Sequence, residues 1–321
     1  MSSVVAGVGA SHSTLMNTRW HDVDHLPRAH AFRDALGESR AVLEAAAVDL
    51  VVIVGSNHFR GFWLDLMPAY TIGVGDVLAA GEHGTPEGPQ AVDKDAAVAV
   101  CNDLVGSDFD VAFSLRLQVD HGITHAIQYV IPAGVPVVPI VVNAFAPPLP
   151  SLRRCLALGS ALGTALAGLP GERKVAVVGT GGLSHRLPFP DWRTPQSDDD
   201  DFLVESWLEG RGRWQDYEAR RRALIMSAPP ELNEDFDRSI LQRLETGALG
   251  RLPDDVDDGE LVSQAGNGAN EVRAWLVMAA ACGHRPGRAL AYSPMPEWLT
   301  GMAVAVIPPP DPPNPQGAPR A

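Results

Sequence analysis

Five runs of apolar and β-branched residues stand out along the chain and predict buried strands. They occupy residues 4–8, 50–54, 135–142, 175–178 and 302–307. Runs of this length, bounded by turn residues, are typical of strands. Residues 50–54 and 175–178 are apolar almost without interruption, which favours a sheet that is covered on both faces.

Stretches with helical spacing of apolar residues lie between these runs. Residues 29–47, 93–104, 152–169 and 263–281 are rich in helix-forming residues and have apolar positions three and four apart. A shorter helix is expected over 126–131. Alternation of strands and helices predicts an α/β fold with a central sheet flanked by helices.

Two segments depart from this alternation. Residues 187–201 are rich in Pro, Asp and Thr and predict a loop, and 201–248 then carry polar, charged helices. We interpret 201–248 as a helical insertion within one domain that spans 1–307. The acidic run 198–201 is expected to be a solvated loop or a helix N-terminus. The Pro-rich residues 308–321 are expected to be a disordered or extended tail.

Composition narrows the functional classes. The 321 residues can bury one sizeable core, and the net charge of -14 argues against nucleic acid and anionic membrane as partners. The chain shows no basic-then-apolar leader, and no apolar run reaches the ~18 residues of a membrane span. The three cysteines are far apart and are expected to be free thiols. We therefore expect a soluble, cytoplasmic protein.

Histidines at the ends of predicted strands are the first candidates for chemistry. His12 follows the first strand in GASHS, and His58 follows the second in GSNHF. Catalytic groups in open α/β sheets gather at such strand ends. Either histidine alone is explained as well by a hydrogen-bonded loop residue. The pair raises the possibility of a divalent-metal site, because a metal needs ligands that converge.

Three further histidines lie in short polar segments. His185 ends the Gly-rich run VAVVGTGGLSH, and His121 and His125 lie in QVDHGITHA beside Asp120. Asp120 could orient an imidazole, or the segment could be a turn before a helix. The glycines after the strand could also approach a phosphate, but no GxGxxG or GxxxxGK[ST] motif is present.

Glu271 lies in the apolar segment NEVRAWLVMAA, where we expect it to be partly buried. A buried carboxylate needs a cation or a metal, and Arg273 and Arg285 are alternative partners. Ser11 and Ser184 each precede a histidine, but no GxSxG elbow accompanies them, which argues against a serine hydrolase. The residues alone thus predict a His-rich site on an α/β sheet and no specific reaction.

Several segments together resemble a known family. In chain order they are SHSTL, NHFRGFWLDLMPAYTIGVG, QVDHG, VPVVPIVVNAFAPPLPSLRRCLALGSALG, GTGGLSH, NEVRAWLVMAA and PMPEWLTG. Their sequence and order resemble the class III extradiol ring-cleavage dioxygenases of the protocatechuate 4,5-dioxygenase type, and within them the enzymes that act on 2,3-dihydroxyphenylpropionate. The resemblance covers nearly the whole chain except the tail, and the 201–248 segment matches more loosely.

The resemblance implies a site and a reaction. Fe(II) would be held by His12, His58 and Glu271, and His121 and His185 would be the acid–base pair, with His185 as base and His121 as acid or in the reverse order. His125 has no clear counterpart. The expected reaction inserts both atoms of O₂ into a catechol, such as 3-(2,3-dihydroxyphenyl)propionate, and gives a ring-opened muconic semialdehyde-type product in aromatic catabolism.

Alternatives concern the substrate and the role. The same chemistry could act on another catechol, an aminophenol or a gallate-like ring, and Arg60, Arg186 and Arg193 are candidates for pairing a substrate carboxylate, although surface roles explain them equally well. A non-catalytic binding relative is a further alternative, against which the intact set of five site residues argues. The resemblance to single-polypeptide members of the family implies a homo-oligomer.

Overall fold

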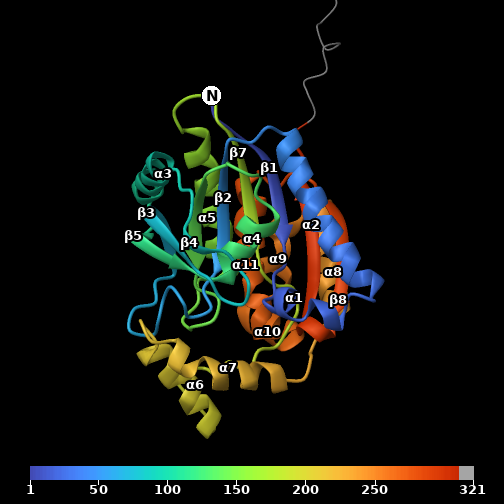
Figure 1. Cartoon of the computed structure of the whole chain (residues 1–321). Helices are drawn as coiled ribbons and strands as arrows, with labels where there is room; N and C mark the ends of the chain where they lie inside the picture. The colour runs from blue at the N-terminus through green and yellow to red at the C-terminus, as the bar shows by residue number, and fades with distance from the viewer. Residues whose placement is uncertain (311–321) are drawn as a thin grey trace, which may run out of the picture.

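The computed structural model describes residues 1–310, and its centre is a nine-stranded mixed sheet (Figure 1). The strand order is β4-β3-β6-β2-β7-β1-β9-β8, and β5 pairs with β3. The strands are β1 (Ser3–Ala10), β2 (Leu50–Ser56), β3 (Tyr70–Ala80), β4 (Glu87–Pro89), β5 (Ala112–Val119), β6 (Val137–Val142), β7 (Lys174–Thr180), β8 (Arg288–Met295) and β9 (Thr300–Ile307).

The middle of the sheet is parallel. β1 and β2 both pair with β7 in parallel, and β6 pairs with β2 in parallel, whereas β9 and β8 add an antiparallel edge. The carboxyl ends of β1, β7 and β2 therefore lie next to one another at one edge of the sheet. In an open α/β sheet this is the edge at which ligands bind.

Helices cover both faces of the sheet, as the apolar runs predict. The helices are α1 (Leu15–Thr18), α2 (Pro27–Ala45), α3 (Lys94–Gly106), α4 (His121–Tyr129), α5 (Leu152–Ala167), α6 (Asp198–Glu209), α7 (Gln215–Ser227), α8 (Glu234–Glu245), α9 (Leu252–Asp255), α10 (Asp258–Ala265) and α11 (Val272–Ala281), with short 3₁₀ turns η1 (Trp20–Asp22), η2 (Leu249–Arg251), η3 (Asn267–Glu271) and η4 (Pro296–Trp298).

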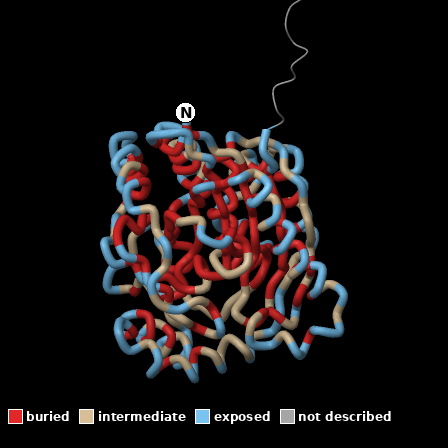
Figure 2. Tube along the Cα trace, turned by 45° about the horizontal axis from the view of Figure 1, so that its top comes forward, coloured by how far each residue is buried: buried red, intermediate tan, exposed pale blue. Residues whose placement is uncertain are grey.

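Alternate residues of each central strand pack on opposite faces. In β2, Val52 and Val54 join the core formed with α3, α5, α8 and α11, while Val51 and Ile53 join the core formed with α2 and α4. Every residue of β2 is buried. Figure 2 shows the resulting continuous buried interior around the sheet. The prediction of a sheet covered on both faces is confirmed.

The five predicted strands are present, but the sequence pattern missed β3, β4, β5 and β8. The helix predicted over 263–281 is also interrupted. Gly266 adopts a left-handed conformation, with φ of 82°, and a side chain there would approach the carbonyl of His185. The chain therefore ends α10, makes the 3₁₀ turn η3 and starts α11. As a result Glu271 lies at a junction and not in mid-helix.

The helices of residues 198–245 fall into two groups. α8 packs into the main core through Phe236, Ile240, Leu241 and Leu244. α6 and α7 instead lie at the lower end of the molecule in Figure 1, beyond the sheet. Leu203 and Trp207 of α6 form a separate apolar cluster with Phe59 and Trp63. The acidic run 198–201 forms the first turn of α6.

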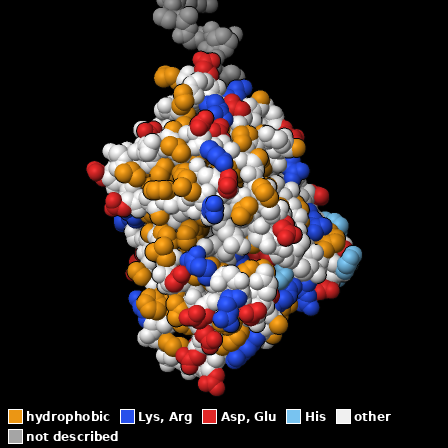
Figure 3. Space-filling view, turned by 60° about the vertical axis from the view of Figure 1, so that its left-hand side comes forward, with side chains coloured by type: hydrophobic (Ala, Val, Ile, Leu, Met, Phe, Trp, Pro, Cys, Tyr) orange, Lys and Arg blue, Asp and Glu red, His pale blue; other side chains and the backbone are white. Residues whose placement is uncertain are grey.

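The surface has one apolar strand at a sheet edge. Phe113 and Leu115 of β5 are 65% and 66% exposed. Figure 3 brings the side with β5 and α3 forward and shows hydrophobic side chains gathered on it. Cys101, Cys155 and Cys282 are free and buried. Among the described residues, no helix is long and apolar enough to cross a membrane. Of the predicted tail, residues 308–310 are exposed, and 311–321 lie outside the described residues.

Candidate metal centre and catalytic site

The carboxyl edge of the parallel strands brings His12 and His58 together. His12 follows the end of β1 by two residues, and His58 follows the end of β2 by two. β7 lies between these strands. The two imidazole centroids are 5.3 Å apart, and both residues are buried. The expectation that two unrelated strand ends place both histidines at one edge is confirmed.

Glu271 meets both imidazoles. Its Oε1 atom lies 3.1 Å from Nε2 of His12 and 3.4 Å from Nε2 of His58. The turn η3 ends at Glu271 and brings its carboxylate against the loop that follows β7. A side chain at Gly181 would come within 2.6 Å of the Glu271 carboxyl carbon, so only glycine leaves room for Glu271 there. Sequence patterns alone did not predict that Glu271 would contact His12 and His58.

The hydrogen bonds around His12 fix its tautomer. The Thr180 hydroxyl donates to the carbonyl of Gly122 at 2.7 Å, so it can only accept from His12 Nδ1, which is also 2.7 Å away. Nδ1 of His12 therefore carries the proton, and Nε2 has a free lone pair. Nε2 is buried and has no hydrogen-bond partner among residues 1–310. A deprotonated imidazole nitrogen without a hydrogen bond can bind a metal.

His58 is oriented in the same way by a carboxylate. Its Nδ1 atom donates to Asp120 at 3.3 Å, and its Nε2 atom faces Glu271. Asp120 also caps α4 by accepting from the backbone of Gly122 at 2.9 Å. Burial lowers the pKa of His58, but Asp120 and Glu271 outweigh it and raise this pKa to about 10. A carboxylate–imidazole pair aimed at a third group is typical of metal sites.

Glu271 is held as an anion. Burial alone would raise the pKa of this carboxyl, but His12 and His58 hold it well below its usual range. Oε2 accepts from the backbone of Gly182 at 2.7 Å, and the Ser56 hydroxyl donates to Oε1. Arg273 and Arg285, the alternative partners, bond elsewhere: Arg273 pairs with Asp258, and Arg285 donates to backbone carbonyls. Nε2 of His12, Nε2 of His58 and one carboxylate therefore converge, and this donor set suits a divalent transition metal, which would take the place of the Nε2 proton of His58.

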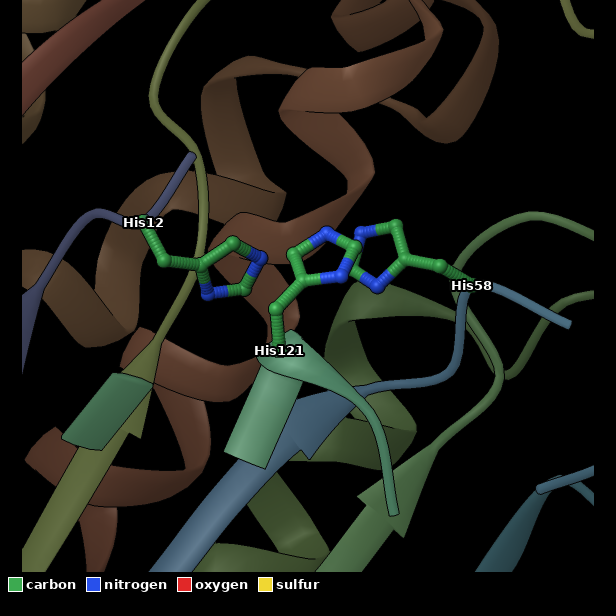
Figure 4. A group of neighbouring side chains, drawn as sticks. All are labelled: His12, His58 and His121. Atoms are coloured by element: carbon green, nitrogen blue, oxygen red, sulfur yellow. The ribbon is translucent and has the colours of Figure 1, made fainter. Parts of the chain in front are cut away.

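His121 lies close enough to be an alternative ligand. Ring nitrogens of His12, His58 and His121 all lie within 4.8 Å of one another. Figure 4 shows the three imidazoles side by side, and the rings of His58 and His121 stack with their centroids 3.9 Å apart. His121 occupies the first turn of α4, so the helix expected over 126–131 begins earlier, at His121, and the alternative of a turn before the helix is wrong. Its Nδ1 atom is bonded to Glu82 at 2.5 Å.

His185 lies beside the carboxylate of Glu271. Its Nε2 atom lies 4.0 Å from Oε2 of Glu271, and its Nδ1 atom donates to the carbonyl of Leu183 at 3.1 Å. Burial lowers the pKa of both His121 and His185. Both rings are thus neutral near neutral pH and keep Nε2 as the free atom. A side chain at Gly268 would lie 2.0 Å from Nε2 of His185, so this glycine makes room for the ring.

The remaining histidine, His125, is buried behind the site. Its ring centroid lies 6.0 Å from that of His12, and neither ring nitrogen has a hydrogen-bond partner among residues 1–310. Burial lowers its pKa well below the usual range. It is therefore a neutral packing residue of the His cluster.

The candidate metal ligands, together with His121 and His185, line one cavity of about 100 Å³. The wall includes His12, His58, His121, His185, Glu271, Glu82, His83, Arg60, Glu218, Arg221, Arg222, Leu187, Phe189, Ile225, Met226 and Trp298. Of the arginines that the sequence suggested, Arg60 lines the cavity, but Arg186 and Arg193 form surface ion pairs with Glu231 and Asp191. Arg221 and Arg222 of α7 were missed, because nothing distinguishes them within the charged run DYEARRRAL.

Known proteins that are similar to this chain are aromatic ring-opening dioxygenases. The chain matches the family described as the catalytic LigB subunit of aromatic ring-opening dioxygenase over residues 8–303. A protein of Rhodococcus jostii named 2,3-dihydroxyphenylpropionate/2,3-dihydroxicinnamic acid 1,2-dioxygenase is 34% identical, covering 92% of this chain and 95% of its own length. Proteins of the same name from Paraburkholderia xenovorans and Mycolicibacterium vanbaalenii are 35% and 34% identical, covering 82% and 92% of this chain and 87% and 94% of their own lengths.

Proposed function

Since the chain belongs to the LigB family of aromatic ring-opening dioxygenases and is an extradiol ring-cleavage dioxygenase, we propose that it is Fe(II)-dependent and acts on a catechol that carries a propionate side chain. The observation that carries the iron assignment is the convergence of His12, His58 and Glu271 at the carboxyl edge of the sheet. The substrate named for the relatives from Rhodococcus jostii and Paraburkholderia xenovorans supports the substrate class.

In this proposal Nε2 of His12, Nε2 of His58 and the carboxylate of Glu271 hold the metal. Thr180 and Asp120 keep the two imidazoles in the required tautomer. Bound Fe(II) would supply open coordination positions for the catechol oxygens and O₂ and would allow electron density to pass between them. The buried, unpartnered Nε2 of His12 supports this assignment over an internal hydrogen-bond network, which would leave no such orphan.

The two neighbouring histidines would move protons. His185 donates Nδ1–H to a backbone carbonyl, so its Nε2 lone pair can accept a proton from a catechol hydroxyl. His121 donates Nδ1–H to Glu82, whose carboxylate stabilises the protonated ring. We therefore propose that His185 is the base for one catechol hydroxyl, and that His121 takes up the proton of the other hydroxyl on Nε2 and later returns it to the substrate as the acid. The product would be a ring-opened muconic semialdehyde-type compound.

A substrate panel with iron-reconstituted protein tests this function. We expect O₂ uptake and a yellow ring-opened product with 3-(2,3-dihydroxyphenyl)propionate, and lower rates with 2-aminophenol and gallate. A higher rate with gallate or an aminophenol would move the enzyme to another substrate class. A fully iron-loaded protein that takes up no O₂ with any catechol would instead indicate a binding role. Zinc-loaded protein is the control, because Zn²⁺ fits similar ligands and has no redox chemistry.

The wider organisation of the molecule is part of the proposal. We infer that residues 1–307 act as one catalytic unit, that 201–248 are an insertion into it, and that the chain forms a homo-oligomer. The exposed apolar residues Phe113 and Leu115 on the edge strand β5 support association, because exposed apolar edges are normally covered. Light scattering of wild type and Leu115→Lys checks this, with a smaller particle expected for the variant.

A further inference from the structure

One fully buried cation of the cavity wall lacks a counter-ion. Arg221 lies in α7 and is 3% exposed, yet it forms no ion pair within residues 1–310. Its Nη2 atom donates to the carbonyl of His58 at 3.3 Å, while Nε and Nη1 have no hydrogen-bond partner there. The guanidinium therefore lies beside a residue of the candidate metal site with two nitrogens unsatisfied.

The acidic groups of the cavity are already engaged by other residues. Glu82 accepts from His121 and lies 3.3 Å from Arg60, and Glu218 pairs with Arg60 and with His83. Glu271 faces the imidazoles. None of these carboxylates is thus within pairing distance of Arg221.

The neighbouring arginines are less isolated than Arg221. Arg60 is neutralised by two glutamates. Arg222 has no carboxylate partner either, but it is only partly buried, and it donates to the Thr18 hydroxyl at 3.0 Å and contacts the ring of His83. A buried cation without an anion is strongly unfavourable, so such an arrangement indicates a site that a ligand completes.

We propose that Arg221 binds the carboxylate at the end of the catechol's side chain and so determines that the enzyme prefers acidic catechols. This inference rests on the proposed ring-cleavage function. With the hydroxyls directed to His12, His58 and Glu271, the ring would lie among the apolar wall residues. The guanidinium presents a planar fork, which matches a carboxylate with two parallel hydrogen bonds.

A pair of substrates that differ in charge tests the proposal. We would measure kcat/KM for 3-(2,3-dihydroxyphenyl)propionate and for 3-propylcatechol, which has a side chain of similar length without a charge. For Arg221→Met, the ratio of the acid to the neutral substrate should fall ~10–100-fold, mainly through a higher KM for the acid. Arg221→Lys, which keeps the charge but not the fork, should give an intermediate ratio. Because each ratio comes from one preparation, it does not depend on the fraction of folded enzyme.

The matched control is Arg220→Met on the same helix. Arg220 is exposed and pairs with Asp199, so its loss should leave the ratio unchanged. An unchanged ratio in Arg221→Met, or a wild-type enzyme that cleaves 3-propylcatechol as well as the acid, would overturn the assignment of Arg221 while leaving ring cleavage intact. Absence of cleavage of either catechol by the iron-loaded wild type would instead contradict the proposed function itself.

Discussion

The carboxyl edge of the sheet and helix α7 both face the cavity, but they hold their side chains in different ways. At the sheet edge each polar group has a fixed partner: Thr180 holds His12, Asp120 holds His58, and the backbone of Gly182 holds Glu271. These residues belong to strand ends or to segments packed on them. Such a framework keeps metal ligands in one arrangement.

Helix α7 is held less completely. Glu218 pairs with Arg60 and His83, but Ile225 and Met226 are only partly buried, and Arg221 has two nitrogens without partners among the described residues. We infer that the sheet edge carries the groups that bind the metal and react, whereas α7 contacts the part of the substrate that does not react. Changes at the edge should therefore affect metal content and turnover, and changes on α7 should affect the choice of substrate.

The largest effect is expected from Glu271→Ala. Loss of the carboxylate leaves two neutral imidazoles, so we expect iron content and ring cleavage to fall below detection. Metal analysis of the reconstituted, desalted protein checks this, with Glu209→Ala on exposed α6 as the control. Stoichiometric iron and full turnover in Glu271→Ala would show that Glu271 is no ligand. The same loss of iron is expected for His12→Ala and His58→Ala.

His121→Ala and His185→Ala should separate chemistry from metal binding. We expect both variants to keep their iron and to lose activity by ~10²–10⁴-fold, which is the usual contribution of general acid–base catalysis. Metal analysis and turnover on the same samples provide the measurement. Loss of iron from His121→Ala would make His121 a ligand, an outcome that its proximity to His12 and His58 makes worth testing.

The sequence predicted much of this edge because its residues follow recognisable strands. The apolar runs located β1, β2 and β7, and in a parallel sheet this is enough to bring His12 and His58 together. Glu271 could not be placed from periodicity, because its position depends on the left-handed Gly266 and on the space that Gly181 leaves. Only the resemblance to a family linked it to the histidines.

Two strands and one residue of the cavity wall were not predicted from the sequence pattern. Strand β3 contains Gly73, Gly75 and Asp76, which weaken its strand pattern. Strand β5 alternates apolar and polar residues, so it has no continuous apolar run of the kind that located the central strands. Arg221 sits among charged neighbours on a helix with no clear apolar face, so only tertiary structure separates it from the exposed Arg220. Sequence patterns therefore locate the rigid edge better than the helix that covers it.

A smaller effect is expected from Thr180→Val. This change keeps the shape of the side chain but removes the acceptor for Nδ1–H of His12, which then has no fixed tautomer. Loss of such a supporting hydrogen bond typically costs ~10–100-fold in metal affinity or activity. Competition with a chelator would measure the change in metal affinity. Thr164→Val, on the exposed side of α5, is the matched control. Equal affinities for wild type and Thr180→Val would mean that packing alone orients His12.

The smallest effect concerns Asp237, which joins the helical segment to the site without touching the metal ligands. Asp237 lies on α8 and accepts hydrogen bonds from the backbone and the hydroxyl of Ser184, the residue before His185, and from Tyr292, each at 2.8 Å. Burial raises its pKa to about 6, although these hydrogen bonds act in the opposite direction. The folded protein therefore binds this proton more tightly than the unfolded chain does.

The stability that comes from this proton is present at low pH and is lost as the pH rises through about 6. Asp237→Asn removes the titration, so between about pH 4 and about pH 7 the free energy of unfolding of wild type should fall by ~2 kcal/mol relative to the variant. Urea unfolding at the two pH values measures this difference, and Asp235→Asn, exposed on the same helix, should behave as wild type. Parallel curves for wild type and Asp237→Asn would mean that Asp237 stays ionised in the folded protein. In that case α8 would hold the His185 segment through a charge, and the contrast with the loosely held α7 would be sharper.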